Sequence, residues 1–84
     1  MDTQKIIDLE QNYVLHTYNR PAFVLDHGKG LWVVDTEGKK YLDFLGGIAV
    51  NALGHCHPVV LKAIEEQMGK LLHVCNLYHT APHA

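Results

Sequence analysis

The sequence predicts an α+β fold: an N-terminal helix, a three-stranded antiparallel meander, a glycine-rich crossing and a second helix. Apolar residues recur at helical spacing near both ends of the chain, and three short β-prone runs separated by turn residues lie between them. The composition, with 48% hydrophobic and 19% charged residues, is that of a folded protein. The 84 residues accommodate one domain at most. A domain this short is only marginally stable without a partner.

The first helix is predicted over residues 3–16, TQKIIDLEQNYVLH, whose apolar side chains follow helical periodicity. Asp2 or Thr3 is expected to cap its start, because both side chains accept hydrogen bonds from free N–H groups of a first turn. Arg20-Pro21 ends any helix that reaches it, because the residue before a proline is pushed toward extended geometry. The apolar face of the predicted helix consists of Ile6, Leu9 and Tyr13, with Ile7 and Val14 beside it.

Three strands are predicted over residues 22–26, 31–35 and 40–44. The polar and glycine-containing stretches between them, residues 26–30 and 35–38, are expected to form turns. In the second of these turns, DTEG, the glycine falls at a position that requires positive φ. Because the connections are short, we expect an antiparallel meander.

The crossing, residues 45–57, contains three glycines and few charges. A surface loop would be more polar, so its backbone is expected to pack closely against another part of the protein. Pro58 is well placed to begin a second helix, predicted over residues 58–73. The stripe expected to be buried consists of Val60, Leu61, Ile64, Met68, Leu71 and Leu72.

The sequence GHCHP, residues 54–58, leaves a zinc site open as one interpretation. Tetrahedral zinc needs four ligands, commonly with a closely spaced pair such as C-x-x-C. This chain has no such pair, and His73, Cys75 and His79 lie beyond the predicted second helix. The better supported interpretation is a structural corner, in which Gly54 bends the chain before the second helix begins.

Two catalytic patterns are weaker still. Cys56 has histidines on both sides, but adjacent side chains rarely reach one another, and catalytic cysteines draw their histidine from elsewhere in a fold. Asp43 together with Asp35 or Glu37 suggests paired carboxylates, yet turn and strand-edge positions explain these residues more simply. No phosphate-binding glycine loop is present in the sequence.

The charge pattern argues against a nucleic-acid-binding module, because the net charge is -2 and the basic residues are scattered. No apolar run approaches the roughly 20 residues of a membrane-spanning helix, and the N-terminus lacks a signal-peptide pattern. Two cysteines are fewer than a small secreted disulfide scaffold usually has. We therefore expect a cytoplasmic protein with reduced thiols and no membrane or nucleic-acid partner.

Residues 41–58, YLDFLGGIAVNALGHCHP, resemble the class III (ornithine-type) aminotransferases, which use pyridoxal phosphate. The resemblance covers nearly the whole chain, from residues 18–21 through the strand pair to NLYHT at residues 76–80. It is strongest to family members that act on N-acetylornithine. In that family such a segment is the N-terminal part of a much longer chain.

The resemblance implies a fold-type I enzyme in which this segment belongs to the small domain. Residues 1–45 would supply the N-terminal helix and antiparallel sheet of that domain. Residues 46–84 would supply a substrate-entrance loop, a helix and a crossing toward a large domain outside this chain. By resemblance, Gly47, Ile48 and Ala49 lie at the substrate entrance, and Asn76, Tyr78 and His79 lie in a loop near an active site of the dimer.

The implied reaction moves the amino group of N-acetylornithine to 2-oxoglutarate in arginine biosynthesis, catalysed by a cytoplasmic homodimer. Pyridoxal phosphate requires a lysine that holds it as a Schiff base. We expect no catalytic, cofactor-binding or metal-binding residue in this chain, and no activity of the chain alone. Its lysines lie in predicted turns or on polar helix faces: Lys5, Lys29, Lys39, Lys40, Lys62 and Lys70.

Two alternatives stay open. The same elements could form a stand-alone protein-interaction module, which would have to cover the apolar crossing with a partner. They could also form a small zinc-binding module that uses His55, Cys56, His57 or Cys75.

Overall fold

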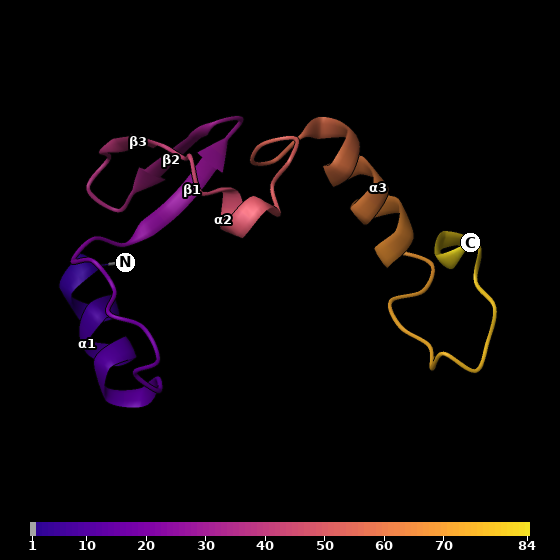
Figure 1. Ribbon diagram of the computed structural model, residues 1–84, viewed down its shortest axis with the longest axis horizontal. Helices are drawn as coiled ribbons and strands as arrows, with labels where there is room; N and C mark the ends of the chain where they lie inside the picture. Colours follow the sequence, from indigo (N-terminus) through magenta and orange to yellow (C-terminus); the bar gives the residue numbers. More distant parts are fainter. Residues whose placement is uncertain (1) are drawn as a thin grey trace.

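The computed structural model describes residues 2–84 and confirms an α+β arrangement (Figure 1). The sheet lies between two helical parts, with the first helix beside one end of it and the last helix beyond the crossing. The elements in chain order are α1 (Thr3–Tyr13), β1 (Leu25–Lys29), β2 (Trp32–Asp35), β3 (Lys40–Leu42), α2 (Gly46–Ala49), α3 (Pro58–Met68) and the short 3-10 helix η1 (Ala81–His83).

The first helix begins as predicted but ends earlier. The Asp2 carboxylate accepts a hydrogen bond from the Gln4 N–H at 2.9 Å, so Asp2 caps the helix. The predicted end at residue 16 is wrong, because the backbone of Val14 is extended (φ -105°, ψ 135°). The side chain of Thr3 reaches the second turn of the sheet, where it donates to Glu37 Oε1 at 2.9 Å.

The three strands form an antiparallel sheet in the order β1-β2-β3, which confirms the predicted meander. The first strand was predicted over residues 22–26, but it covers Leu25–Lys29, so most of the predicted first turn is strand. The tip of this hairpin is Gly30 and Leu31, since Lys29 pairs with Trp32. Gly30 has φ +60°, which suits the first residue of a two-residue hairpin turn.

The second turn, Asp35 to Gly38, forms as predicted. Gly38 has φ +85°, and its N–H donates to the carbonyl of Asp35 at 3.0 Å. The small core lies in the sheet, where Val33 is 8% exposed and Asp35 is 5% exposed. Every other residue of 2–84 is at least partly exposed.

The third strand ends at Leu42 rather than at the predicted residue 44. Asp43 still donates its N–H to the carbonyl of Leu31 at 2.8 Å, but the chain turns directly afterwards. The crossing that follows contains α2, whose backbone has positive φ throughout.

The last long helix starts at Pro58, as predicted, but ends at Met68 instead of residue 73. Its apolar stripe is not buried in this chain, which corrects the prediction. The exposed fractions of the six stripe residues run from 41% for Val60 to 84% for Leu72. Figure 1 shows why: α3 projects away from the sheet, and within residues 2–84 only the strands pack against one another as elements.

Candidate functional site

The centre of the candidate site is a left-handed turn in the crossing. All four residues of α2 have positive φ: Gly46 (+58°), Gly47 (+65°), Ile48 (+62°) and Ala49 (+63°). Glycine adopts this conformation freely, whereas other L-residues are strained there by about 1–2 kcal/mol each. Strained residues of this kind concentrate at functional sites and persist only where their surroundings hold them. Ile48, the β-branched residue, is 77% exposed.

Hydrogen bonds within the crossing close this turn. The N–H groups of Val50 and Asn51 both donate to the carbonyl of Gly46, at 2.7 and 2.8 Å. The Ala49 N–H donates to the carbonyl of Leu45 at 3.1 Å. The predicted apolar crossing is therefore an ordered turn that presents its side chains outward.

Asp43 fixes the start of the turn. Its Oδ1 accepts hydrogen bonds from the N–H groups of Leu45 and Gly46 at 3.0 and 2.9 Å. Its Oδ2 lies 2.6 Å from Nε2 of His55. Since an ionised carboxylate can only accept, the imidazole is the donor. The hydrogen bond from Gly46, followed by that from His55, lowers the pKa of the Asp43 carboxyl below its ordinary value of 3.8.

The GHCHP segment is the structural corner that the sequence predicted. Gly54 has φ +81°. The backbone of His55 pairs with the hairpin tip, since its N–H donates to the carbonyl of Gly30 at 2.8 Å and its carbonyl accepts from the Gly30 N–H at 2.9 Å. His57 is extended, and its Nδ1 accepts from the Val59 N–H at 3.2 Å, which caps α3.

The metal and nucleophile interpretations of GHCHP gain no support from the geometry. Within residues 2–84, no three histidine, cysteine or acidic side chains gather where they could hold a metal ion. Cys56 and Cys75 are exposed free thiols. Cys56 has φ +54°, so the segment is not the strand that would aim His55 and His57 the same way.

The predicted dimer-loop residues lie apart from the turn. Asn76, Tyr78 and His79 follow α3 in an exposed segment, and α3 separates them from α2 (Figure 1). A turn stabilises this segment, in which the Tyr78 N–H donates to the carbonyl of Cys75 at 3.2 Å. Their position near an active site of a dimer stays a prediction.

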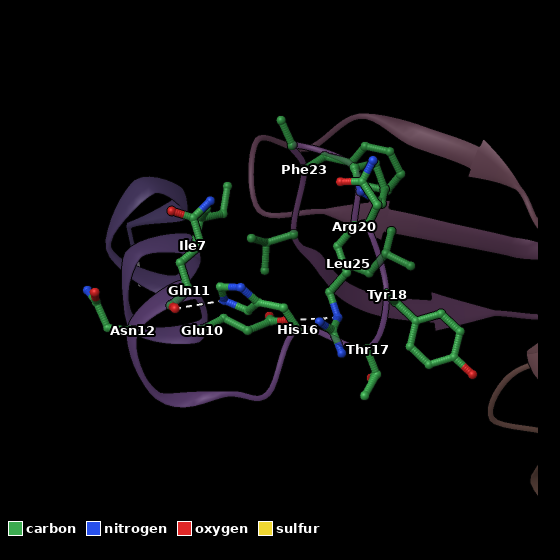
Figure 2. Close-up of a pocket in the computed structure, with 14 residues that line it drawn as sticks. Ile7, Glu10, Gln11, Asn12, His16, Thr17, Tyr18, Arg20, Phe23 and Leu25 are labelled. Carbon is green, nitrogen blue, oxygen red and sulfur yellow. Dashed lines mark hydrogen bonds and ion pairs between the residues drawn. The ribbon is translucent and has the colours of Figure 1, made fainter.

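A second feature, which the sequence did not predict, is an open hollow of about 900 Å³ between the end of α1 and residues 16–25 (Figure 2). The guanidinium of Arg20 lies 2.6 Å from Oε1 of Glu10 across it, and the Tyr18 ring centroid is 6.0 Å from the same guanidinium. The two side chains that carry full charges in its lining therefore pair with each other. The available sequence signal was a basic residue directly before a proline, Arg20, which follows a helix that contains Glu10.

Comparisons with known proteins agree with this geometry. A family model described as aminotransferase class-III matches residues 13–84. The acetylornithine aminotransferase of Methanocaldococcus jannaschii is 52% identical over 82 residues, which cover 98% of this chain and 21% of the relative. The crystal structure of acetylornithine aminotransferase from Elizabethkingia anophelis superposes with a TM-score of 0.89 at 36% identity, over 96% of this chain and 21% of that one. Ornithine δ-aminotransferase of Plasmodium falciparum superposes with a TM-score of 0.88 at 33% identity and the same coverage.

The helix, meander and crossing therefore form part of the fold of pyridoxal-phosphate-dependent aminotransferases. The chain belongs to the class-III aminotransferase family. It spans about a fifth of the length of the relatives it matches.

The family depends on pyridoxal phosphate, but no lysine of this chain fits the role of its anchor. Its anchor is a lysine in a desolvated site, where the amine loses its proton readily. Every lysine of the chain is exposed: Lys5, Lys29, Lys39, Lys40, Lys62 and Lys70. We therefore assign no chemical step to a residue of this chain.

Proposed function

We propose that this chain is the N-terminal segment of an aminotransferase that moves the amino group of N-acetylornithine to 2-oxoglutarate, in arginine biosynthesis. The observation that carries the proposal is 52% identity over 98% of the chain to a protein named acetylornithine aminotransferase. The complete enzyme is a cytoplasmic homodimer that holds pyridoxal phosphate. The chain alone neither binds that cofactor firmly nor turns over substrate.

In this proposal the segment shapes the entrance to the active site. Gly47, Ile48 and Ala49 form the entrance, which is supported by their exposed, left-handed turn. Residues 1–45 act as part of the small domain, and residues 46–84 lead toward the large one. The exposed segment with Asn76, Tyr78 and His79 reaches an active site of the dimer.

A chimeric enzyme tests this proposal. Residues 2–84 replace the corresponding segment of the M. jannaschii acetylornithine aminotransferase, and glutamate formation is measured with N-acetylornithine or ornithine as donor. We expect turnover with N-acetylornithine within about tenfold of the parent enzyme, and weaker turnover with ornithine. The isolated 84-residue chain, mixed with pyridoxal phosphate, should keep no Schiff-base absorption band once the free cofactor is removed by gel filtration.

Two outcomes count against the proposal. A folded, cofactor-loaded chimera that is inactive with both donors contradicts the role as an aminotransferase segment. A chimera that prefers ornithine keeps that role but contradicts the assignment of N-acetylornithine.

A stand-alone interaction module is the second candidate, favoured by the exposed apolar side chains of the crossing and of α3. Such a module should form a defined dimer or complex at micromolar concentration without cofactor. Sedimentation of the isolated chain separates the two candidates. Non-specific aggregation fits a segment that lacks the rest of its protein, whereas a single well-defined dimer favours the module.

A further inference from the structure

We propose that Asp43 and His55 act as a pair of positioning residues, which hold the left-handed turn Gly46–Ala49 in the shape that the substrate entrance requires. The inference rests on the proposed function for the role of the entrance. The geometry of the pair itself stands on the structure alone.

The two residues close the neck of the crossing. The chain leaves the sheet at Asp43 and returns to the hairpin at His55, twelve positions later. Both ends are attached to the hairpin tip by backbone hydrogen bonds, Asp43 to Leu31 and His55 to Gly30. The side chains then meet across the neck at 2.6 Å.

The surroundings of the pair favour a strong hydrogen bond. The side chains of His55 and Asp43 are only 24% and 18% exposed. A hydrogen bond to an ionised group is stronger than a neutral one, and partial burial protects it from competing water. The imidazole packs directly on Gly28, where an added Cβ would lie 3.0 Å from His55 Cγ. The ring therefore has little freedom to turn away from the carboxylate.

The carboxylate transmits this constraint to the turn. Its other oxygen binds the N–H groups of Leu45 and Gly46, at the point where the backbone enters the left-handed conformation. Isoleucine and alanine have no intrinsic preference for positive φ, so contacts from outside the turn have to hold Ile48 and Ala49 in this conformation. Asp43 is that anchor, and His55 orients Asp43.

Hydrogen exchange of the chimeric enzyme, followed by mass spectrometry, tests the geometry without using activity. We expect His55→Phe and His55→Asn to accelerate exchange in residues 45–50 about tenfold, because each loses the bond to Asp43. His55→Gln should restore protection, since its amide nitrogen extends about as far as the imidazole Nε2. Asp43→Ala should match or exceed His55→Phe. The double variant should add little, as expected of residues that act as one unit.

Two comparisons make the exchange result decisive. His27→Phe is the matched control, because His27 also pairs with an aspartate at 2.7 Å, but 65% and 59% of the two side chains are exposed. It should leave exchange in residues 45–50 unchanged. A variant that unfolds as a whole shows faster exchange in α3 as well. In that case the variant of the other member of the pair, Asp43 or His55, is used instead. Equal exchange in the parent chimera, His55→Phe and Asp43→Ala overturns the proposal.

Steady-state kinetics separates positioning from mere stability. We expect His55→Phe and His55→Asn to raise the KM for the amino donor about tenfold while kcat changes less than about twofold. His55→Gln should return the KM toward that of the parent chimera. A fall in thermal stability with unchanged KM, or a loss confined to kcat, overturns the assignment to the entrance. An inactive parent chimera instead refutes the proposed function, and the exchange experiment still decides the role of the pair.

Discussion

Two aspartates with similar local roles bracket β3. Asp35 Oδ1 accepts from the N–H groups of Glu37 and Lys39, both at 2.9 Å, and Oδ2 accepts from the Tyr41 hydroxyl at 2.8 Å. Asp43 binds the backbone after the strand in the same manner. These contacts confirm the sequence interpretation of Asp35 and Asp43 as turn and strand-edge residues. Each satisfies backbone donors that a tight turn leaves free.

The pH dependence of the sheet should follow Asp35. The hydrogen bond from Tyr41, with those from the backbone, lowers the pKa of the Asp35 carboxyl below its ordinary value of 3.8. The carboxylate therefore stabilises the sheet fully above that ordinary value, and the contribution is lost as the pH falls through the lowered pKa. We expect Asp35→Asn to be less stable at neutral pH and to lose part of its acid sensitivity. Trp32, the single tryptophan, reports unfolding of the sheet by its fluorescence.

Tyr41→Phe tests whether the hydrogen bond from Tyr41 causes the acid sensitivity that Asp35 gives the sheet. It removes the largest contribution to the lowered pKa of Asp35, so the acid transition should move toward higher pH. The same hydrogen bond raises the pKa of Tyr41 above its ordinary value of 10.0, so its contribution is lost again as the pH rises through the raised pKa. Identical acid transitions in all three proteins would contradict this account.

At the scale of elements, the sequence predicted the parts that depend on local chemistry. Asp2 caps α1, Gly38 completes the second turn and Pro58 starts α3, and each effect involves neighbouring residues only. The first strand was misplaced because its end depends on the hairpin tip at Gly30. The backbone of Gly30 is paired with His55, which is far away in the sequence.

The candidate site was only partly accessible to sequence reasoning. The resemblance placed Gly47, Ile48 and Ala49 together, and glycine content indicated an unusual backbone. Neither the resemblance nor the glycine content indicated that Ile48 and Ala49 would also adopt positive φ. Their conformation depends on contacts made by Asp43, and no local propensity of isoleucine or alanine favours it.

The junction between the hairpin and the corner gives a prediction at this scale. In Gly54→Ala the new Cβ would lie 2.8 Å from the carbonyl oxygen of Gly30, a backbone atom that cannot move freely. The residue would also be strained at φ +81°. We expect a loss of more than about 2 kcal/mol in the free energy of unfolding, measured by denaturant titration of Trp32 fluorescence.

Gly38→Ala is the matched control, because Gly38 has φ +85° but nothing within 4 Å of an added Cβ. This variant should show the conformational strain alone, about 1 kcal/mol. The difference between the two variants measures the contact with Gly30. Equal losses would show that the corner and the hairpin tip are packed less closely than the 2.8 Å approach to Gly30 implies.

At the scale of the whole molecule, the chain exposes far more surface than its size requires. Its accessible surface is 7711 Å², whereas a compact protein of this mass exposes about 5000 Å². The radius of gyration is 16.9 Å, compared with about 12 Å for a compact domain of this length. The excess is comparable to the area of a large obligate interface. Within residues 2–84 no helix is both long and apolar enough to cross a membrane.

The apolar stripe of α3 accounts for part of this excess and gives the last prediction. Leu61 and Ile64 lie one turn apart and are 48% and 56% exposed. In the isolated chain, Leu61→Glu and Ile64→Glu together should reduce the binding of a hydrophobic dye. Each change should alter stability by less than about 0.5 kcal/mol, because exposed positions tolerate polar residues. The control is Lys62→Gln on the polar face, which lowers the net charge by one, as each single glutamate substitution does. It should leave dye binding unchanged.

The same pair of substitutions should act differently in the chimeric enzyme. If the rest of the enzyme covers this face, each glutamate places an unpaired charge in an apolar interface, which costs several kcal/mol. We therefore expect the doubly substituted chimera to lose soluble, cofactor-loaded protein, whereas the Lys62→Gln chimera keeps it. If the doubly substituted chimera keeps as much soluble, cofactor-loaded protein as the Lys62→Gln chimera, α3 stays exposed in the longer protein. Its apolar stripe would then serve an external partner, as the interaction module requires.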